Sequence, residues 1–162
     1  MGLFDRLRGD GKPRVAFFGI DGVPYSLIAE NRDEFENLTA IEEEGSGGAI
    51  DSIVPPESSA CWPSLTTGVN PGQTGVYGFQ DRENGSYETY VPMGQDVQAT
   101  RVWDRVQSAQ RQATVMNVPV SFPPQENVQR MVSGFLSPGV DRAATPEEIR
   151  TYLDGIDYKI DV

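Results

Sequence analysis

The segment with the clearest capacity for chemistry runs from Pro55 to Gly68 and reads PPESSACWPSLTTG. It follows an apolar run at 49–54 and begins a predicted helix with Ser58 and Ser59. A serine at a helix start lies beside backbone N–H groups at the positive end of the helix dipole, which favour an attacking alkoxide and a bound phosphate alike. The competing interpretation is that Ser58 or Ser59 only caps the helix, as serine commonly does. On this segment alone, both interpretations stay open.

A second candidate is Asp21, which directly follows the apolar run RVAFFGI at 14–20. A carboxylate at the end of a strand can ligate a divalent cation, although Asp-Gly is also an ordinary turn dipeptide. Ligand sites in open α/β sheets collect at the carboxyl ends of the strands. We therefore expect Asp21 and Ser58 to converge on one edge of a parallel sheet.

The chain contains no histidine among its 162 residues, which excludes a Ser-His-Asp triad, a Cys-His dyad and a histidine-rich zinc site within them.

Its formal net charge of −11 disfavours nucleic acid as a ligand. Few lysines on an acidic surface favour a halophilic source. The single Cys61 fits a reducing compartment, and the chain shows no secretory signal and no membrane span, so a cytoplasmic location is expected.

The elements that must position these residues follow an alternating pattern of strands and helices, which predicts a parallel sheet covered on both faces. A short leader is expected at 1–12, and an excursion with a hairpin near Asn84-Gly85 at 69–96. Strands are predicted at 14–20, 49–54, 113–118 and 131–135, with helices over 24–44, over 58–67, around 102–106, and from 145 onward with Thr145 as N-cap and Pro146 at N1.

Several segments in order resemble the opening motifs of the type I phosphodiesterase/nucleotide pyrophosphatase branch of the alkaline phosphatase superfamily. They are GIDG at 19–22, the 55–68 segment, NPGQTGVYGF at 70–79, and, as in archaeal and bacterial members, NVPVSFPP at 117–124 and SGFLSP at 133–138. The resemblance implies a three-layer αβα fold with a mostly parallel sheet, of which 13–162 is the N-terminal portion. It also implies a hydrolase site with two divalent cations, zinc or manganese, in the full-length family member, acting on a small phosphate-ester substrate. We do not expect this chain alone to bind these ions stably.

Carried across residue by residue, Asp21 matches the first metal-binding aspartate of the family, and Ser58 matches the nucleophile that also ligates a metal. Ser58 lies as far ahead of Thr67-Gly68 as the modified cysteine of the related sulfatases lies ahead of a Thr-Gly pair. Cys61 falls three residues too late, so we expect it to be a small buried core residue, with Trp62 and Leu65 also packing.

The chain also departs from the family pattern. Thr74 stands where the family commonly has histidine, Gly78-Phe79 replaces the Asp-Asn pair of the eukaryotic pyrophosphatases, and no segment matches the remaining Asp/His metal ligands. We expect no turnover by this chain alone, and the uncapped end at Val162 predicts a longer protein. The alternative is a catalytically dead, phosphatase-like binding or assembly module, and a phosphoglycerate-mutase-like relative is a third interpretation. An interrupted sheet favours self-association into a homo-oligomer.

Overall fold

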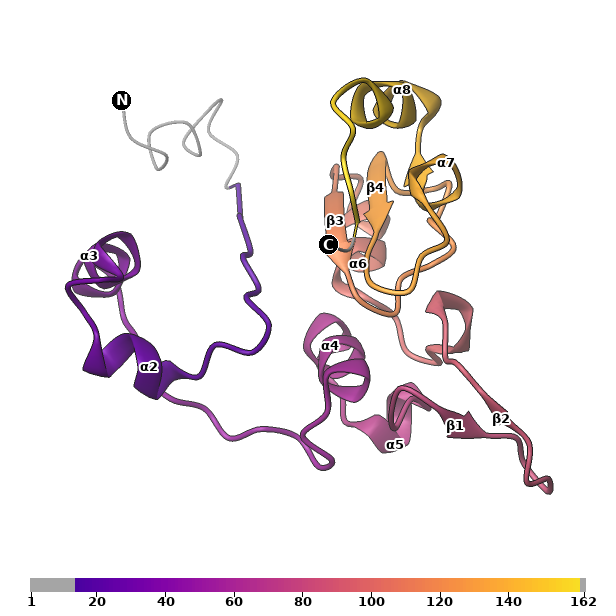
Figure 1. Cartoon of the computed structure of the whole chain (residues 1–162), viewed down its shortest axis with the longest axis horizontal. Coiled ribbons are helices and arrows are strands. Elements are labelled where there is room, and N and C mark those ends of the chain that lie inside the picture. Colours follow the sequence, from indigo (N-terminus) through magenta and orange to yellow (C-terminus); the bar gives the residue numbers. More distant parts are fainter. Residues whose placement is uncertain (1–13, 161–162) are drawn as a thin grey trace. The chain divides into compact units, whose positions relative to one another are not determined.

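The computed structural model describes residues 14–160 and divides the chain into two compact units, Met1–Ile50 and Asp51–Val162. Both helices and small sheets are present (Figure 1), so the expected mixture of α and β structure is confirmed. The predicted leader at 1–12 lies outside the described residues.

The described part of the first unit has two short helices, α2 (Tyr25–Glu30) and α3 (Glu36–Glu44), where the sequence predicted one helix over 24–44. The break follows Asn31, whose side-chain Nδ2 donates to the carbonyl of Leu27 and whose backbone leaves the helical region. Glu42 on α3 ties the two helices together. Its Oε1 accepts a hydrogen bond of 2.6 Å from Tyr25 Oη, and its Oε2 pairs with Arg32 Nη1 at 2.8 Å.

These contacts make the packing of the two helices pH-dependent. The hydrogen bond from Tyr25 and then that from Arg32 lower the pKa of Glu42. The pKa of Glu42 in the folded chain therefore lies below its pKa in the unfolded chain. The stabilisation that ionised Glu42 gives is fully present above the unfolded-state pKa, and it is lost as the pH falls through the folded-state pKa. The protection factors of the α3 amides, which correct for the slower intrinsic exchange at low pH, are expected to fall on acidification more steeply in the parent chain than in a Glu42→Gln variant. Parallel pH profiles for the two proteins would contradict this.

The predicted strands at 14–20 and 49–54 are wrong for the described structure, because neither segment carries a strand there. Most of their apolar side chains are exposed instead, with 90 % of Val15, 75 % of Phe18 and 89 % of Ile50 accessible to solvent. An apolar run indicates a capacity for burial, but a strand also needs a neighbouring strand for its backbone hydrogen bonds. No such neighbour pairs with these two segments among residues 14–160.

In the second unit, a three-stranded sheet has the order β3 (Thr114–Val118), β4 (Arg130–Ser133), β5 (Ala144–Thr145). β3 pairs parallel with β4, whereas β5 pairs antiparallel with β4. The strands predicted at 113–118 and 131–135 are thus confirmed within a residue or two. The expected mostly parallel sheet is not found among residues 14–160, where the sheets are small and partly antiparallel.

The central strand β4 buries side chains on both of its faces. Met131 packs with Trp103 of α6 (Val102–Ser108), whereas Val132 packs with Leu153 of α8 (Glu147–Gly155). Successive side chains of a strand point to opposite faces, so α6 and α8 pack on opposite faces of β4. The short helix α7 (Val140–Ala143) leads into β5.

The start of α8 differs from the predicted start. Pro146 is the N-cap and Glu147 the first helical residue, whereas the sequence placed Thr145 at the N-cap and Pro146 at N1. Thr145 instead belongs to β5, where it pairs with Met131. Strand pairing therefore holds Thr145 in the sheet and moves the helix start along by one residue.

The remaining elements of this unit are short and lie between 58 and 96. They are α4 (Ser58–Thr67), α5 (Pro71–Thr74), β1 (Asp81–Arg82), β2 (Thr89–Tyr90) and the 3₁₀ turn η2 (Gly94–Asp96). β1 and β2 pair antiparallel across the Asn84-Gly85 turn, where Gly85 has a φ of 78°. Helices α4 and α5 pack against each other.

Candidate active site

Ser58 is the first residue of α4, as the sequence predicted, and the helix ends at Thr67 before a left-handed Gly68. The N-cap is Glu57, with an extended backbone at φ −124° and ψ 136°, and no side chain caps the helix there. The interpretation of Ser58 or Ser59 as the N-cap is therefore wrong. Only 3 % of Ser59 is exposed, whereas Ser58 is half-buried, so Ser58 is the more accessible hydroxyl.

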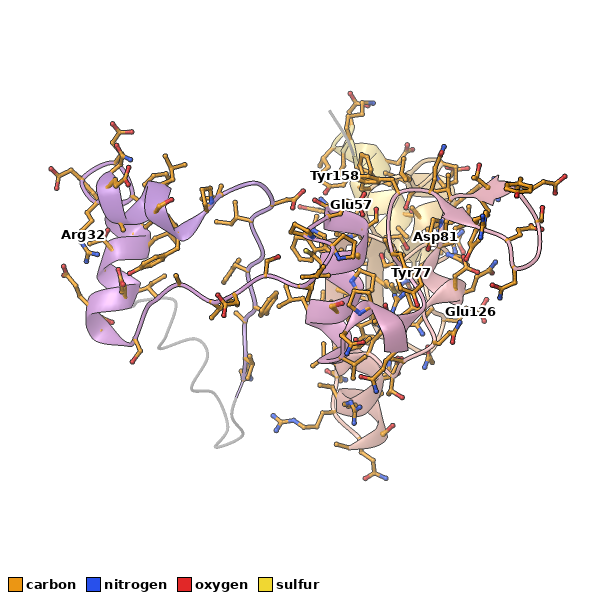
Figure 2. All side chains as sticks on the ribbon, turned by 90° about the horizontal axis from the view of Figure 1, so that it is seen from below. Arg32, Glu57, Tyr77, Asp81, Glu126 and Tyr158 are labelled. Carbon is orange, nitrogen blue, oxygen red and sulfur yellow. The ribbon has the colours of Figure 1, made fainter. Side chains whose placement is uncertain are left out.

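Glu57 also holds the loop that follows α5. Its backbone carbonyl accepts the N–H groups of Ala60 and Cys61, at 3.0 and 2.8 Å, and so closes the first turn of α4. Its side-chain Oε1 accepts the N–H of Phe79 at 3.0 Å. The loop is braced again where the N–H of Tyr77 donates to Asp81 Oδ2 at 3.1 Å (Figure 2). The 77–81 loop is thus tied to the residue that precedes Ser58.

An aromatic contact connects the same loop to the sheet. The rings of Phe79 and Phe135 meet edge to face, with centroids 5.7 Å apart and planes at 70°. Phe135 lies just beyond the carboxyl end of β4. A chain of direct contacts therefore links the start of α4, the 77–81 loop and the carboxyl end of β4, the edge at which parallel α/β sheets bind ligands.

Asp21 lies in a turn of the first unit, exposed to solvent and followed by Gly22 with a φ of 71°. Ser58 belongs to the second unit. The convergence of Asp21 and Ser58 on one site accordingly stays a prediction from the sequence. Among residues 14–160, no group of three or more His, Cys, Asp or Glu side chains could hold a metal ion.

The neighbours of Ser58 on α4 differ from the expected packing. Cys61 is half-buried rather than a core residue, with its Sγ 3.9 Å from Ser52 Oγ, and 51 % of Leu65 is exposed. The residues that α4 buries are small, namely Ser59, Ala60, Pro63, Ser64, Thr66 and Thr67. They recur at three- and four-residue spacing, so they form one face of the helix, and Leu65 falls outside it.

Thr74, for which the resemblance implied a histidine in relatives, is completely buried. Its hydroxyl accepts the N–H of Val76 at 3.3 Å and donates to the carbonyl of Pro71 at 3.4 Å. Its own carbonyl accepts the N–H of Gln98 at 2.8 Å. Thr74 therefore holds the turn after α5 and is not presented to a ligand.

The residue that the sequence did not single out is Glu57. Its Oε2 has less than 1 Å² of exposed surface and no hydrogen-bond partner among the described residues. Its position directly before Ser58 was visible in the sequence. The contact with Phe79, 22 positions along the chain, was not.

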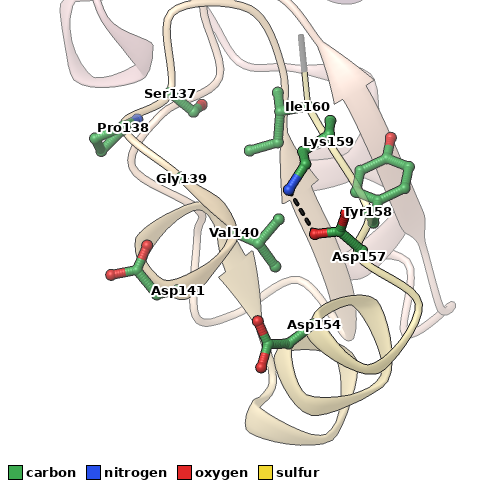
Figure 3. A pocket seen from close by; sticks show the side chains of 10 residues that line it. All are labelled: Ser137, Pro138, Gly139, Val140, Asp141, Asp154, Asp157, Tyr158, Lys159 and Ile160. Atoms are coloured by element: carbon green, nitrogen blue, oxygen red, sulfur yellow. Dashed lines mark hydrogen bonds and ion pairs between the residues drawn. The ribbon is translucent and has the colours of Figure 1, made fainter. Parts of the chain in front are cut away.

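A cavity of about 490 Å³ opens elsewhere, between the loop before α7 and the end of α8 (Figure 3). Three aspartates line it, Asp141, Asp154 and Asp157, and Asp157 pairs with Lys159 at 2.5 Å. Neither Asp21 nor Ser58 lies among its lining residues. All three aspartates are exposed, so their charges are solvated without a ligand.

No helix within residues 14–160 is long and apolar enough to cross a membrane.

No curated protein and no solved structure matches the chain. The family model for type I phosphodiesterases and nucleotide pyrophosphatases matches residues 15–160, a span that contains Asp21, Ser58 and the whole described sheet. The chain therefore belongs to the Type I phosphodiesterase / nucleotide pyrophosphatase family.

Proposed function

We propose that this chain supplies Asp21 and Ser58 to a metal-dependent phosphohydrolase site of the phosphodiesterase type, in an alkaline-phosphatase-like fold. Ser58 is the nucleophile and a metal ligand, Asp21 is a metal ligand, and the substrate is a small phosphate ester. The observation that carries this proposal is the position of Ser58 as the accessible first residue of α4, linked by contacts to the carboxyl end of β4.

The chemistry follows from where α4 holds the hydroxyl. Ser58 Oγ forms a bond to phosphorus while the bond from phosphorus to the leaving alcohol oxygen breaks, which leaves a phosphoserine ester for water to cleave. The positive end of the α4 dipole favours the negative charge on the attacking oxygen. Divalent cations, which the family typically uses, supply a lower pKa for the hydroxyl and charge neutralisation at phosphorus when bound.

The donors present fit such a cation in part. Asp21 and Ser58 both offer oxygen, and the chain has no histidine. Oxygen donors suit a hard cation such as Mn²⁺ better than they suit zinc, which prefers nitrogen and sulfur. Two protein donors are too few to hold the ion in a closed geometry.

We therefore expect the 162-residue chain to lack turnover. With bis-p-nitrophenyl phosphate and either Mn²⁺ or Zn²⁺, the parent chain and a Ser58→Ala variant purified in parallel are expected to release p-nitrophenolate at the same background rate. Absorbance of the released phenolate measures this. A metal-dependent rate that disappears in Ser58→Ala would support Ser58 as the nucleophile and contradict the expectation that the 162 residues alone lack turnover.

The second candidate function is a catalytically dead binding or assembly module. The buried Thr74 at the family's histidine position favours it, because that hydroxyl is used within its own turn. The exposed apolar runs at 14–20 and 49–54 favour self-association of such a module. A dead module needs no cation at α4, so Mn²⁺ binding that depends on Ser58 separates the two functions.

For the cellular setting, we propose a salt-rich, reducing cytoplasm. The net charge of −11 and a lysine content limited to Lys12 and Lys159 support high salt, since counterions screen the repulsion among acidic groups. The single Cys61 supports a reducing compartment.

A further inference from the structure

Asn84 and Gly85 lie at the tip of the turn that joins β1 to β2 (Figure 1). Hydrogen bonds on either side hold this turn. Glu83 donates its N–H to the carbonyl of Glu88 at 3.0 Å, and Ser86 donates its N–H to the carbonyl of Glu83 at 3.1 Å. Among the described residues, the N–H of Gly85 and the side-chain amide of Asn84 have no such partner, and both residues are exposed. The two groups are therefore available to each other.

The space around Gly85 is open. A Cβ added to it would meet no atom within 4 Å, and its φ of 78° is a conformation that glycine adopts without strain. Because glycine has no Cβ, nothing crowds its own backbone nitrogen. The asparagine side chain has the length at which its carbonyl carbon and the next backbone nitrogen close a five-membered ring. The turn leaves room for that ring.

The other asparagines of the chain lack this combination. Asn31 already donates its side-chain amide to a backbone carbonyl, and Asn127 precedes Val128, whose N–H bonds the carbonyl of Gln125 at 3.0 Å. The residues that follow these other asparagines all carry side chains, and they are Arg32, Leu38, Pro71, Val118 and Val128. A branched side chain crowds the reacting nitrogen, and proline has no N–H. Asn84 alone is followed by glycine.

We propose that Asn84 is a site of spontaneous deamidation through a succinimide, with water as the co-reactant. The nitrogen of Gly85 forms a bond to the side-chain carbonyl carbon of Asn84 and loses its proton. The bond from that carbon to the amide nitrogen breaks, and ammonia leaves. One water then opens the ring, at one carbonyl to give aspartate or at the other to give isoaspartate, in which the main chain runs through the side-chain carbon. Asparagine is one of the residues that hyperthermophilic proteins use sparingly for its lability.

Either product adds a negative charge to a turn in which Glu83 and Glu88 are already exposed. Isoaspartate also adds one carbon to the main chain between β1 and β2. The change falls in the hairpin whose first residue, Asp81, accepts the N–H of Tyr77. No step of it uses Ser58 or a cation, so this inference is independent of the proposed function.

The test is incubation of the full chain at mildly alkaline pH in water labelled with ¹⁸O, followed by peptide mapping with mass spectrometry. Ring opening introduces one labelled oxygen at position 84, and electron-transfer fragmentation distinguishes isoaspartate from aspartate. Both products are expected there. Conversion at Asn84 is expected to precede conversion at every other asparagine, because only its following nitrogen is uncrowded.

Asn84→Gln keeps an exposed amide, but its additional methylene would require a less favourable six-membered ring. We expect this variant to lose the products at 84, together with the acidic species that accumulates on isoelectric focusing of the parent chain. Asn127→Gln is the matched control, because it changes another exposed asparagine of the same unit. It is expected to form the products at 84 as the parent does. Circular dichroism verifies that both variants fold.

Aspartate without isoaspartate at 84 would overturn the inference, because direct hydrolysis of the amide gives aspartate alone. Conversion at 84 in the urea-unfolded chain but not in the folded chain would also overturn it, since the turn would then protect the pair. Earlier conversion at another asparagine, or an undiminished acidic species in Asn84→Gln, would contradict the assignment to Asn84.

Discussion

Replacing Arg101 with methionine is expected to lower the free energy of unfolding of the second unit by about 3 kcal/mol. Only 4 % of Arg101 is exposed, and its Nη2 donates to the carbonyls of Gly94 at 3.0 Å and Val120 at 2.8 Å. The guanidinium also lies 5.1 Å from the centre of the Trp103 ring. Methionine replaces much of the volume but leaves both carbonyls without this donor.

Burial lowers the pKa of Arg101 to about 10, so the guanidinium is still charged at neutral pH and its hydrogen bonds are charge-assisted. These bonds matter for the candidate site, because Val120 belongs to the segment that leaves the carboxyl end of β3. Gly94, in turn, donates its N–H to the carbonyl of Phe122 at 2.6 Å. Arg101 thus fixes the chain that leaves this edge of the sheet.

Urea unfolding followed by tryptophan fluorescence and circular dichroism measures the effect. Arg105→Met is the matched control, since Arg105 lies on α6, the helix that Arg101 precedes as N-cap, and is exposed to solvent. We expect that change to stay within about 0.5 kcal/mol, as for most surface substitutions. Similar losses in the two variants would contradict the role of the buried hydrogen bonds of Arg101.

Local signals predicted α4 well. Two serines after a proline pair mark its start and Gly68 marks its end, and the structure places both boundaries there. The N-cap was not predicted, because glutamate is not a favoured capping residue and Glu57 occupies that position through a tertiary contact with Phe79. A contact across 22 positions depends on how the intervening chain closes, which local pattern does not determine.

The sheet was predicted only in part for a related reason. The segments 114–118 and 130–133 pair with each other as β3 and β4. The apolar runs at 14–20 and 49–54 pair with no strand among the described residues. A hydrophobic pattern indicates which side chains tend to be buried, but it does not specify which strand a segment pairs with. The two-residue strand β5 was missed because it is too short for alternation to show.

The second large effect concerns the cation that Asp21 and Ser58 are proposed to share. Losing even an outer-shell partner commonly weakens a metal site by about tenfold or more, so losing a carboxylate ligand is expected to weaken it by at least that much. Asp21→Asn is therefore expected to raise the Mn²⁺ concentration needed to occupy a site at α4, in the other unit of the chain. Asp33→Asn is the control, because it removes one exposed carboxylate from the same unit as Asp21.

The most direct measurement is the nuclear magnetic resonance spectrum of the ¹⁵N-labelled chain during titration with small amounts of Mn²⁺, which broadens the signals of nearby amides. The amides of Gly22 and Ser59 are predicted to broaden at the same Mn²⁺ concentration, and both are predicted to resist broadening in Asp21→Asn but not in Asp33→Asn. Broadening at Ser59 that leaves Gly22 sharp and persists unchanged in Asp21→Asn would contradict a shared metal site.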